Sequence, residues 1–207
     1  MEDSVSQLLA EELPPPLRLA VSYAPRRAQA AWTALLALDR RLSRAALGAS
    51  EPLLGQIRLA WWRDRFREPA SQWPGGEPLL AALEGFDPER PALEALVDGW
   101  EQMIGQPDEA ALANLVEARA HAVVALAHIL GCRDRDDEVS AAARAWSRRD
   151  LASGPNGSRS AAGRAAAIRL PRSMRPLVIL TALAEQGDSA HGLRGFLRIV
   201  RLGLLGC

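Results

Sequence analysis

Apolar residues recur at intervals of three and four along most of the chain, which is the spacing of one helix face. The longest such run covers 26–47, between Pro25 and Gly48, residues typical of helix ends. β-branched residues are few and no alternating pattern is sustained, so no strand is predicted. The pattern predicts helices over 4–13, 17–23, 26–47, 53–66, 77–84, 91–104, 109–130, 138–152, 171–185 and 191–205.

These helices predict an all-α, single-domain bundle over residues 1–207. Residues 1–16 end in three prolines and are expected to be peripheral. Residues 153–169, rich in Gly and Ser at their start, are expected to form a mobile loop. Gly131 is predicted to end the helix over 109–130. The packing face of the helix over 138–152 is expected to comprise Ala141, Ala142, Ala145 and Trp146.

Charge and composition bear on nucleic-acid binding, on phosphate contacts and on the cellular compartment. The chain has 25 basic and 25 acidic residues, so no global field attracts it to nucleic acid. All basic residues are Arg, which fits either a GC-rich genome or contacts to phosphates. Cys132 and Cys207 show neither metal-site spacing nor a disulfide framework, which favours a reducing cytoplasm.

No signal peptide is evident, and no apolar run approaches the ~20 residues of a membrane span. The tail at 196–205 is apolar and carries Arg198 and Arg201. We expect this terminal helix to pack on the core, with peripheral contact to a membrane surface as the alternative. The predicted location is cytoplasmic, with membrane association through this helix as an option.

The stretch 56–66 contains two adjacent tryptophans among arginines. Neighbouring side chains on a helix point about 100° apart, so Trp61 and Trp62 cannot share one face. The sequence therefore predicts that one ring packs inside the bundle. The other is expected to line a binding surface with Arg58 or Arg65 nearby.

Residues 52–66 contain the pattern Pro-x-x-x-Gln-x-Arg-Leu-x-Trp-Trp-Arg-Asp, which resembles a signature of the squalene/phytoene synthase family. Weaker matches follow in the same order as in the family, and they cover most of the chain. They are Ser22-Tyr23 with Arg26-Arg27, the run 34–38, the segment 117–131, and Trp146–Asp150 followed by Leu170-Pro171. The chain is most similar to the branch that includes mitochondrial complex I assembly proteins and short bacterial homologues.

The resemblance implies the isoprenoid synthase fold, a helical bundle around a central cavity. Active members join two prenyl diphosphates head to head, and Mg²⁺ stabilises the departing pyrophosphate. The family holds this Mg²⁺ with two Asp-x-x-x-Asp motifs, whose carboxylates share a helix face.

The sequence departs from both acidic motifs. Asp39 is followed four residues later by Ser43, and Asp150 is followed by Gly154. The tyrosine that the family places before Leu-Pro is Arg169 here. Asp39 and Asp150 are therefore the candidate catalytic and Mg²⁺-binding residues if the protein is active. Otherwise no cofactor is expected.

The resemblance also implies a set of side chains that would contact the substrate or its diphosphate. Local ion pairing and plain helix packing are the alternative interpretations for the arginines and tryptophans. The candidate set is Ser22, Tyr23, Arg26, Arg27, Gln56, Arg58, Trp61 and Trp62.

We therefore expect a catalytically degenerate family member that acts in binding or in assembly, on the pattern of the complex I assembly proteins. One alternative is an active head-to-head prenyltransferase that uses Mg²⁺. Another is an isoprenoid or lipid carrier that uses the ancestral cavity. The expected partners are an isoprenyl diphosphate or other apolar ligand, or a protein.

Overall fold

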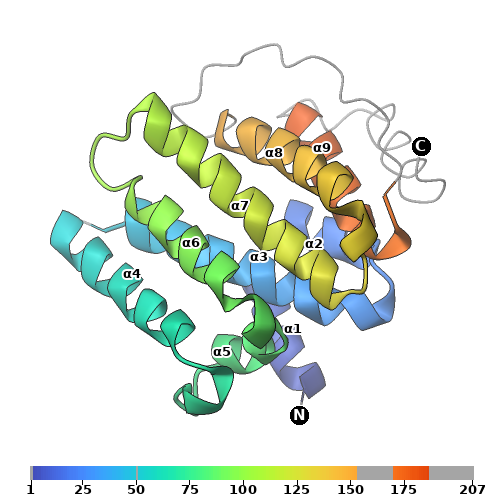
Figure 1. The fold of residues 1–207 in the computed structure, drawn as a ribbon, viewed down its shortest axis with the longest axis horizontal. Coiled ribbons are helices and arrows are strands. Elements are labelled where there is room, and N and C mark those ends of the chain that lie inside the picture. The colour runs from blue at the N-terminus through green and yellow to red at the C-terminus, as the bar shows by residue number, and fades with distance from the viewer. Residues whose placement is uncertain (1, 50, 153–169, 187–207) are drawn as a thin grey trace.

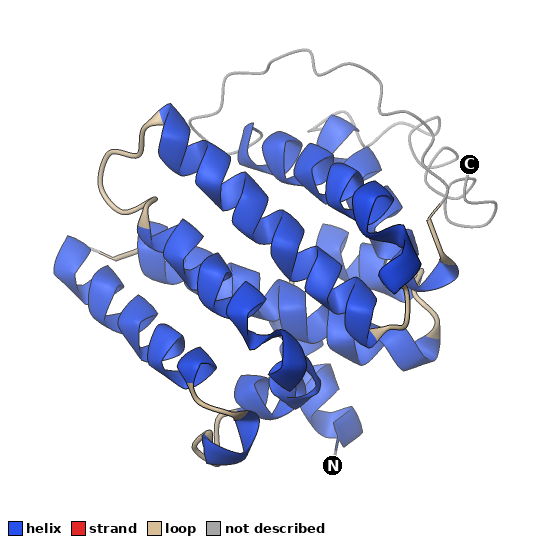
Figure 2. Cartoon of the chain, viewed as in Figure 1, coloured by secondary structure: helices blue, strands red, loops and turns tan. Residues whose placement is uncertain are grey.

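The computed structural model describes residues 2–49, 51–152 and 170–186, and these residues form helices and loops without strands (Figures 1 and 2). The sequence prediction of an all-α fold is confirmed. The helices are α1 Glu2–Glu12, α2 Pro15–Ser22, α3 Arg26–Leu47, α4 Pro52–Arg67, α5 Pro78–Leu83, α6 Arg90–Glu101, α7 Glu109–Ile129, α8 Asp136–Ala152 and α9 Arg175–Gln186, with short 3₁₀ turns at Ala70–Gln72, Glu84–Glu89, Arg133–Arg135 and Arg172–Met174.

The helices pack in two layers. In Figure 1, α4, α6, α7 and α8 lie side by side, and α3 crosses behind them. All residues of α3 from Trp32 to Asp39 are buried, because other helices pack against α3 on more than one side. The Trp32 indole donates a hydrogen bond of 2.8 Å to the Ser173 carbonyl oxygen, which joins α3 to the turn before α9. This central position of α3 places Asp39 in the interior.

Two glycines shape α6 and α7. Gly131 has a φ of 77° directly after α7, and its N–H bonds to the His128 carbonyl while the Cys132 N–H bonds to the Ala127 carbonyl. This is the Schellman arrangement, so the predicted helix end at Gly131 is confirmed. A Cβ added to Gly99 would lie 2.9 Å from the Ala118 Cβ, so glycine permits the close approach of α6 to α7.

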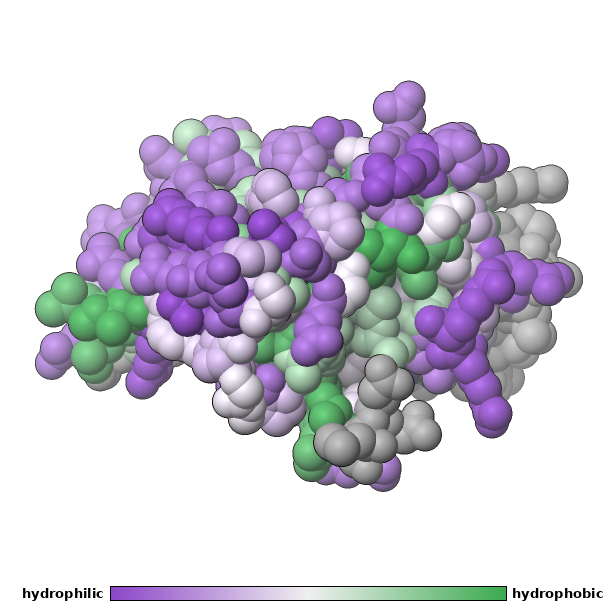
Figure 3. Space-filling view, turned by 60° about the horizontal axis from the view of Figure 1, so that its bottom comes forward, coloured by the Kyte–Doolittle hydropathy of each residue, from purple (hydrophilic) through white to green (hydrophobic). Residues whose placement is uncertain are grey.

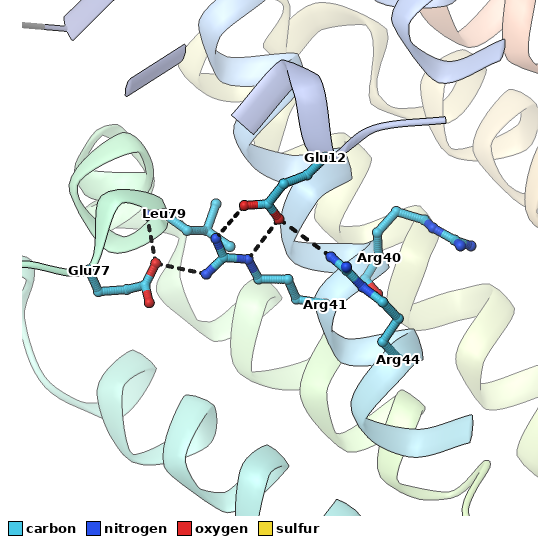
Figure 4. Close-up of polar contacts among 6 residues, drawn as sticks. All are labelled: Glu12, Arg40, Arg41, Arg44, Glu77 and Leu79. Atoms are coloured by element: carbon cyan, nitrogen blue, oxygen red, sulfur yellow. Dashed lines mark hydrogen bonds and ion pairs between the residues drawn. The ribbon is translucent and has the colours of Figure 1, made fainter. Parts of the chain in front are cut away.

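An ion-pair network fastens α1 and α5 to α3 (Figure 4). Arg41 of α3 donates from Nη2 to Glu12 at 2.8 Å and from Nη1 to Glu77 at 2.7 Å. Glu77 also accepts the Leu79 N–H at 3.0 Å and so caps α5. The Arg41 hydrogen bonds are the main reason why the pKa of Glu12 is lowered.

The N-terminal segment 1–16, expected to be peripheral, forms part of the bundle. Leu9 and Leu13 are 1% and 3% exposed, because the apolar face of α1 packs on α3 and α5. The predicted packing face of α8 is partly wrong. Ala142 and Trp146 are buried, whereas Ala141 is exposed and the neighbouring buried positions are Val139, Ala143 and Ser147.

Two further expectations fall on residues that the structure does not describe. The loop over 153–169 and the C-terminal helix with its membrane contact both lie outside the described residues. Among the described helices, α7 is long and apolar enough to cross a membrane. Charged residues such as Arg119 interrupt its apolar run, so the expectation that no segment approaches a membrane span did not include it. In this fold 61% of its most apolar window is buried, as in the core helix of a bundle. The finding is weakly compatible with membrane association.

Candidate functional site: a buried arginine between two carboxylates

Asp39 lies in the interior of the bundle with both carboxylate oxygens bonded. Its Oδ1 accepts from the Trp100 indole at 2.8 Å and from Arg119 Nε at 3.0 Å, and its Oδ2 accepts from Arg119 Nη2 at 2.5 Å. α3, α6 and α7 each contribute one of these side chains. A buried carboxylate is tolerated only when its charge is paired and hydrogen-bonded, and Asp39 meets both conditions.

Arg119 is the centre of the site. It is 4% exposed although it is charged, and it stands near the middle of the apolar helix α7. Its Nη1 donates to Asp150 Oδ2 at 2.8 Å, while its other edge forms the two-bond fork with Asp39. The planar guanidinium suits this arrangement, because its donors point to both carboxylates at once. The triad of Asp39, Arg119 and Asp150 thus links α3, α7 and α8 through one cation.

Two tryptophans contact the same guanidinium. The Arg119 Cζ lies 5.3 Å from the centroid of Trp100 and 4.9 Å from that of Trp146. Both distances fall within the range of cation–π attraction. The rings also exclude water from the Asp39 side of the triad, while the side chain of Asp150 is 41% exposed. The triad therefore has one buried end and one end at the surface.

The electrostatic state of Arg119 follows from these contacts. Burial disfavours its charge, but the Asp39 and Asp150 carboxylates outweigh burial and raise the pKa of Arg119 above its usual range. The guanidinium therefore stays charged at any pH at which the protein is folded. One positive charge faces two carboxylates, which leaves one net negative charge at the surface end.

The space beside the triad is nearly filled. The cavity there has a volume of about 10 Å³. That is at the lower limit for one water molecule, whereas ligand pockets usually span hundreds of cubic ångströms. Its lining consists of apolar side chains and the triad, namely Leu35, Leu36, Asp39, Leu96, Arg119, Ala122, Val123 and Trp146. The cavity beside the triad is therefore far smaller than a prenyl chain requires.

The donor set does not fit a Mg²⁺ cluster. Mg²⁺ takes oxygen ligands in octahedral geometry, and here the two candidate carboxylates already accept hydrogen bonds from a permanent cation between them. A divalent ion at the same place would be repelled by that guanidinium. Among the described residues, no group of three His, Cys, Asp or Glu side chains gathers in a metal-binding arrangement. The structure thus brings Asp39 and Asp150 together, around Arg119.

The candidate diphosphate-binding residues near α2 and α3 lie apart from the triad. Arg26 and Arg27 are exposed at the first turn of α3, roughly 20 Å from Asp39 along the helix. Ser22 Oγ donates to the Leu19 carbonyl at 2.7 Å, and Tyr23 is half-buried against the core. Ser22 also lines an open groove of about 330 Å³ between α1, α2 and α3.

The candidates on α4 face two directions. Trp62 is 7% exposed and stacks on Phe66 at 5.8 Å, whereas Trp61 is 41% exposed and meets Trp62 edge to face at 4.9 Å. The prediction that one ring packs inside the bundle is confirmed, and the role of Trp61 in a binding surface stays a prediction. Gln56 and Arg58 are exposed as well. None of these four side chains contacts the triad through a described hydrogen bond or ring contact.

Sequence reasoning missed Arg119, Trp100 and the contact of Trp146 with the guanidinium. A signal was present: Arg119 falls four residues after Leu115 and seven before Leu126, on the buried stripe of an otherwise apolar helix. A charge at such a position requires a buried partner. The acidic motifs by themselves do not indicate a basic residue between the carboxylates of Asp39 and Asp150.

Comparison with known families gives one match. The squalene/phytoene synthase model matches residues 17–150, which is more than half of the chain and reaches from α2 to the carboxylate of the triad on α8. Comparisons with curated proteins and with solved structures return no significant match. The matched range includes Trp61 and Trp62 on α4. The chain therefore belongs to the squalene/phytoene synthase family.

Proposed function

We propose that this chain is a catalytically silent member of the squalene/phytoene synthase family that acts in binding or assembly. The observation that carries the proposal is the Arg119 guanidinium, which joins Asp39 to Asp150 where active members direct acidic residues at Mg²⁺. An internal cation pairs with both carboxylates but cannot coordinate a departing pyrophosphate as a metal does. Loss of that stabilisation costs several kcal/mol of barrier, or many orders of magnitude in rate.

The filled interior supports the same proposal. A prenyl chain needs an apolar tunnel of hundreds of cubic ångströms, and the cavity beside the triad holds about 10 Å³. This weighs against the two alternatives, an active prenyltransferase and a lipid carrier that uses the ancestral cavity. For an assembly role, the family branch to which the sequence is most similar suggests a respiratory-chain partner. A cytoplasmic location with peripheral membrane contact stays a prediction.

A turnover assay tests the catalytic part. The purified protein is incubated with farnesyl or geranylgeranyl diphosphate and Mg²⁺, and pyrophosphate release is measured. We expect no release above the protein-free blank. Mg²⁺-dependent release that is lost in Asp150→Ala but kept in Asp137→Ala would overturn the proposal. Asp137 is a matched control because it is an exposed carboxylate at the other end of α8.

Affinity capture from cells of the source organism tests the assembly part. We expect enrichment of a respiratory-chain subunit or assembly partner over a capture with an unrelated helical protein. Recovery of neither would contradict an assembly role. Mass spectrometry of organic extracts from the same preparation tests the carrier alternative, for which an apolar ligand at stoichiometric yield is the expected result.

A further inference from the structure

The outer face of α4 carries a stripe of exposed apolar side chains. Leu53, Ile57 and Trp61 recur every four residues and are 62%, 57% and 41% exposed, and Leu54 beside them is 42% exposed. Leu47, at the end of α3 just before α4, is 60% exposed. In Figure 3 a hydrophobic patch projects at the left edge, where Figure 1 places the N-terminal end of α4.

The inner face of α4 is apolar too. Gly55, Leu59, Trp62 and Phe66 are buried against α3 and α6, on the side opposite the exposed stripe. A surface helix normally has one apolar face and one polar face, whereas a helix that is apolar on both sides is normally covered on both. Single exposed leucines are common, but a contiguous patch marks an interaction site.

Trp61 makes this patch suitable for specific binding. Its ring is fixed edge to face against the buried Trp62, so little side-chain entropy is lost when a partner packs on it. Tryptophans held in this way are frequent energetic centres of interfaces. The patch therefore combines a rigid aromatic anchor with flanking aliphatic side chains.

The charges along one edge of the patch are arranged for self-pairing. Glu51, Arg58 and Arg65 are spaced seven residues apart, so they follow one flank of the stripe, with the acid at the N-terminal end and bases further along. If a second copy lies antiparallel, Glu51 of each copy meets Arg65 of the other. The existing Arg65–Glu68 pair, at 3.4 Å on the surface, is weak and exchangeable.

We propose that the outer face of α4 is the contact surface of a symmetric homodimer, with two α4 helices antiparallel across a two-fold axis near Ile57 and Arg58. A two-fold contact is the commonest form of self-association, and a net charge of zero imposes no net repulsion between copies. The two Glu51–Arg65 pairs offset the approach of Arg58 to its counterpart at the axis. The proposal does not depend on whether the protein is catalytically silent.

The exposed area of the patch indicates how much surface the dimer would bury. The five apolar side chains expose on the order of 500 Å² per copy, so the dimer buries roughly 1,000 Å², the lower limit of specific interfaces. We expect a weak dimer, with a dissociation constant in the micromolar range tested below. A membrane is a poorer occupant, because three of the four arginines of α4 are already paired with acids of this chain. The rim also includes the exposed acids Glu51 and Asp64, whereas membrane-surface helices present basic residues that are free to meet anionic lipids.

Sedimentation equilibrium of the full chain between about 1 and 200 μM tests the proposal. We expect a monomer–dimer equilibrium that Ile57→Glu weakens at least tenfold. Leu8→Glu is the matched control, since Leu8 is also 57% exposed but lies on α1, and it is expected to leave the equilibrium unchanged. Circular dichroism confirms that both variants stay folded.

A charge exchange tests the antiparallel geometry. Glu51→Arg and Arg65→Glu alone are each expected to weaken the dimer several-fold, and the double variant is expected to restore it. The Glu51 side chain makes no capping hydrogen bond, so its replacement leaves the start of α4 intact. A monomer at all concentrations, or a dimer unaffected by Ile57→Glu, would overturn the proposal. Binding to anionic vesicles that Ile57→Glu abolishes, without any dimer, would assign the face to membranes instead.

Discussion

The triad inside the bundle and the outer face of α4 are opposites. The triad places three charges in the interior and satisfies them with hydrogen bonds, ion pairs and two aromatic rings. The α4 face places apolar side chains in water, with no described residue covering them. The first region is largely closed, and only its Asp150 end reaches the surface. The second is open, and its exposed apolar side chains are available to a partner.

The largest expected effect breaks the triad. Arg119→Leu leaves the Asp39 carboxylate buried without its cation, and we expect a loss of about 3–5 kcal/mol in the free energy of unfolding. Urea unfolding followed by far-ultraviolet circular dichroism measures it. The double variant Asp39→Leu with Arg119→Leu removes both charges and is expected to recover much of the loss. A loss below about 1 kcal/mol in the single variant would mean that the triad does not hold the core together.

The next effect compares the two faces of α4 directly. Trp62→Ala removes a buried ring that stacks on Phe66, and we expect a loss of about 3–5 kcal/mol in unfolding free energy. Trp61→Ala is expected to change the stability of the monomer by less than about 1 kcal/mol, because a large part of that ring is already in water. Thermal unfolding at a concentration below dimerisation measures both. Equal losses would contradict the division of α4 into an inner and an outer face.

The smallest effect concerns a surface cluster that resembles the triad in form but titrates. His128 of α7 bonds to Glu89 at 2.9 Å through Nδ1 and to Asp136 at 2.9 Å through Nε2, and Arg133 also pairs with Glu89. Partial burial lowers the pKa of His128, but the bonds to the two carboxylates outweigh it, so the net pKa is raised. The added stability is therefore complete below the unfolded pKa of about 6.5 and is lost as pH rises through the folded pKa.

Unfolding free energies measured between pH 6 and 9 test this prediction. We expect the wild type to lose up to about 1 kcal/mol more than His128→Gln over that range. The His128→Gln variant serves as the baseline, since it keeps a polar side chain that does not titrate. Parallel curves for the two proteins would show that the charge on His128 contributes nothing. Arg119 provides the contrast, because its charge does not change in this range.

The fold could be predicted from the sequence wherever apolar and polar residues contrast. The bounds of α3 were predicted at 26–47 because Pro25, Gly48 and a dense apolar stripe mark them. The packing face of α8 was partly wrong because the run of alanines has little hydrophobic contrast, so its rotation about the helix axis was undetermined. The 3₁₀ turn Glu84–Glu89 gave no periodic signal at all.

The site was less predictable than the fold. Asp39 and Asp150 could be chosen from the family resemblance, and the structure brings them to one guanidinium. What could not be derived was which group lies between them, because that depends on the relative rotation of three helices. Local sequence also could not show that Trp100, sixty-one positions from Asp39, would donate to the same carboxylate.

Arg119 also affects how readily the unfolded α7 segment would insert into a membrane. It occupies the centre of α7, the described helix whose length and composition match a membrane span. An arginine at the middle of such a segment raises the free energy of insertion into a bilayer by about 2.5–3.5 kcal/mol. We therefore expect this one side chain to disfavour membrane insertion of α7 before the helix meets its partners in the bundle. The residue that joins Asp39 to Asp150 is thus also the one that sets α7 apart from an uninterrupted membrane span.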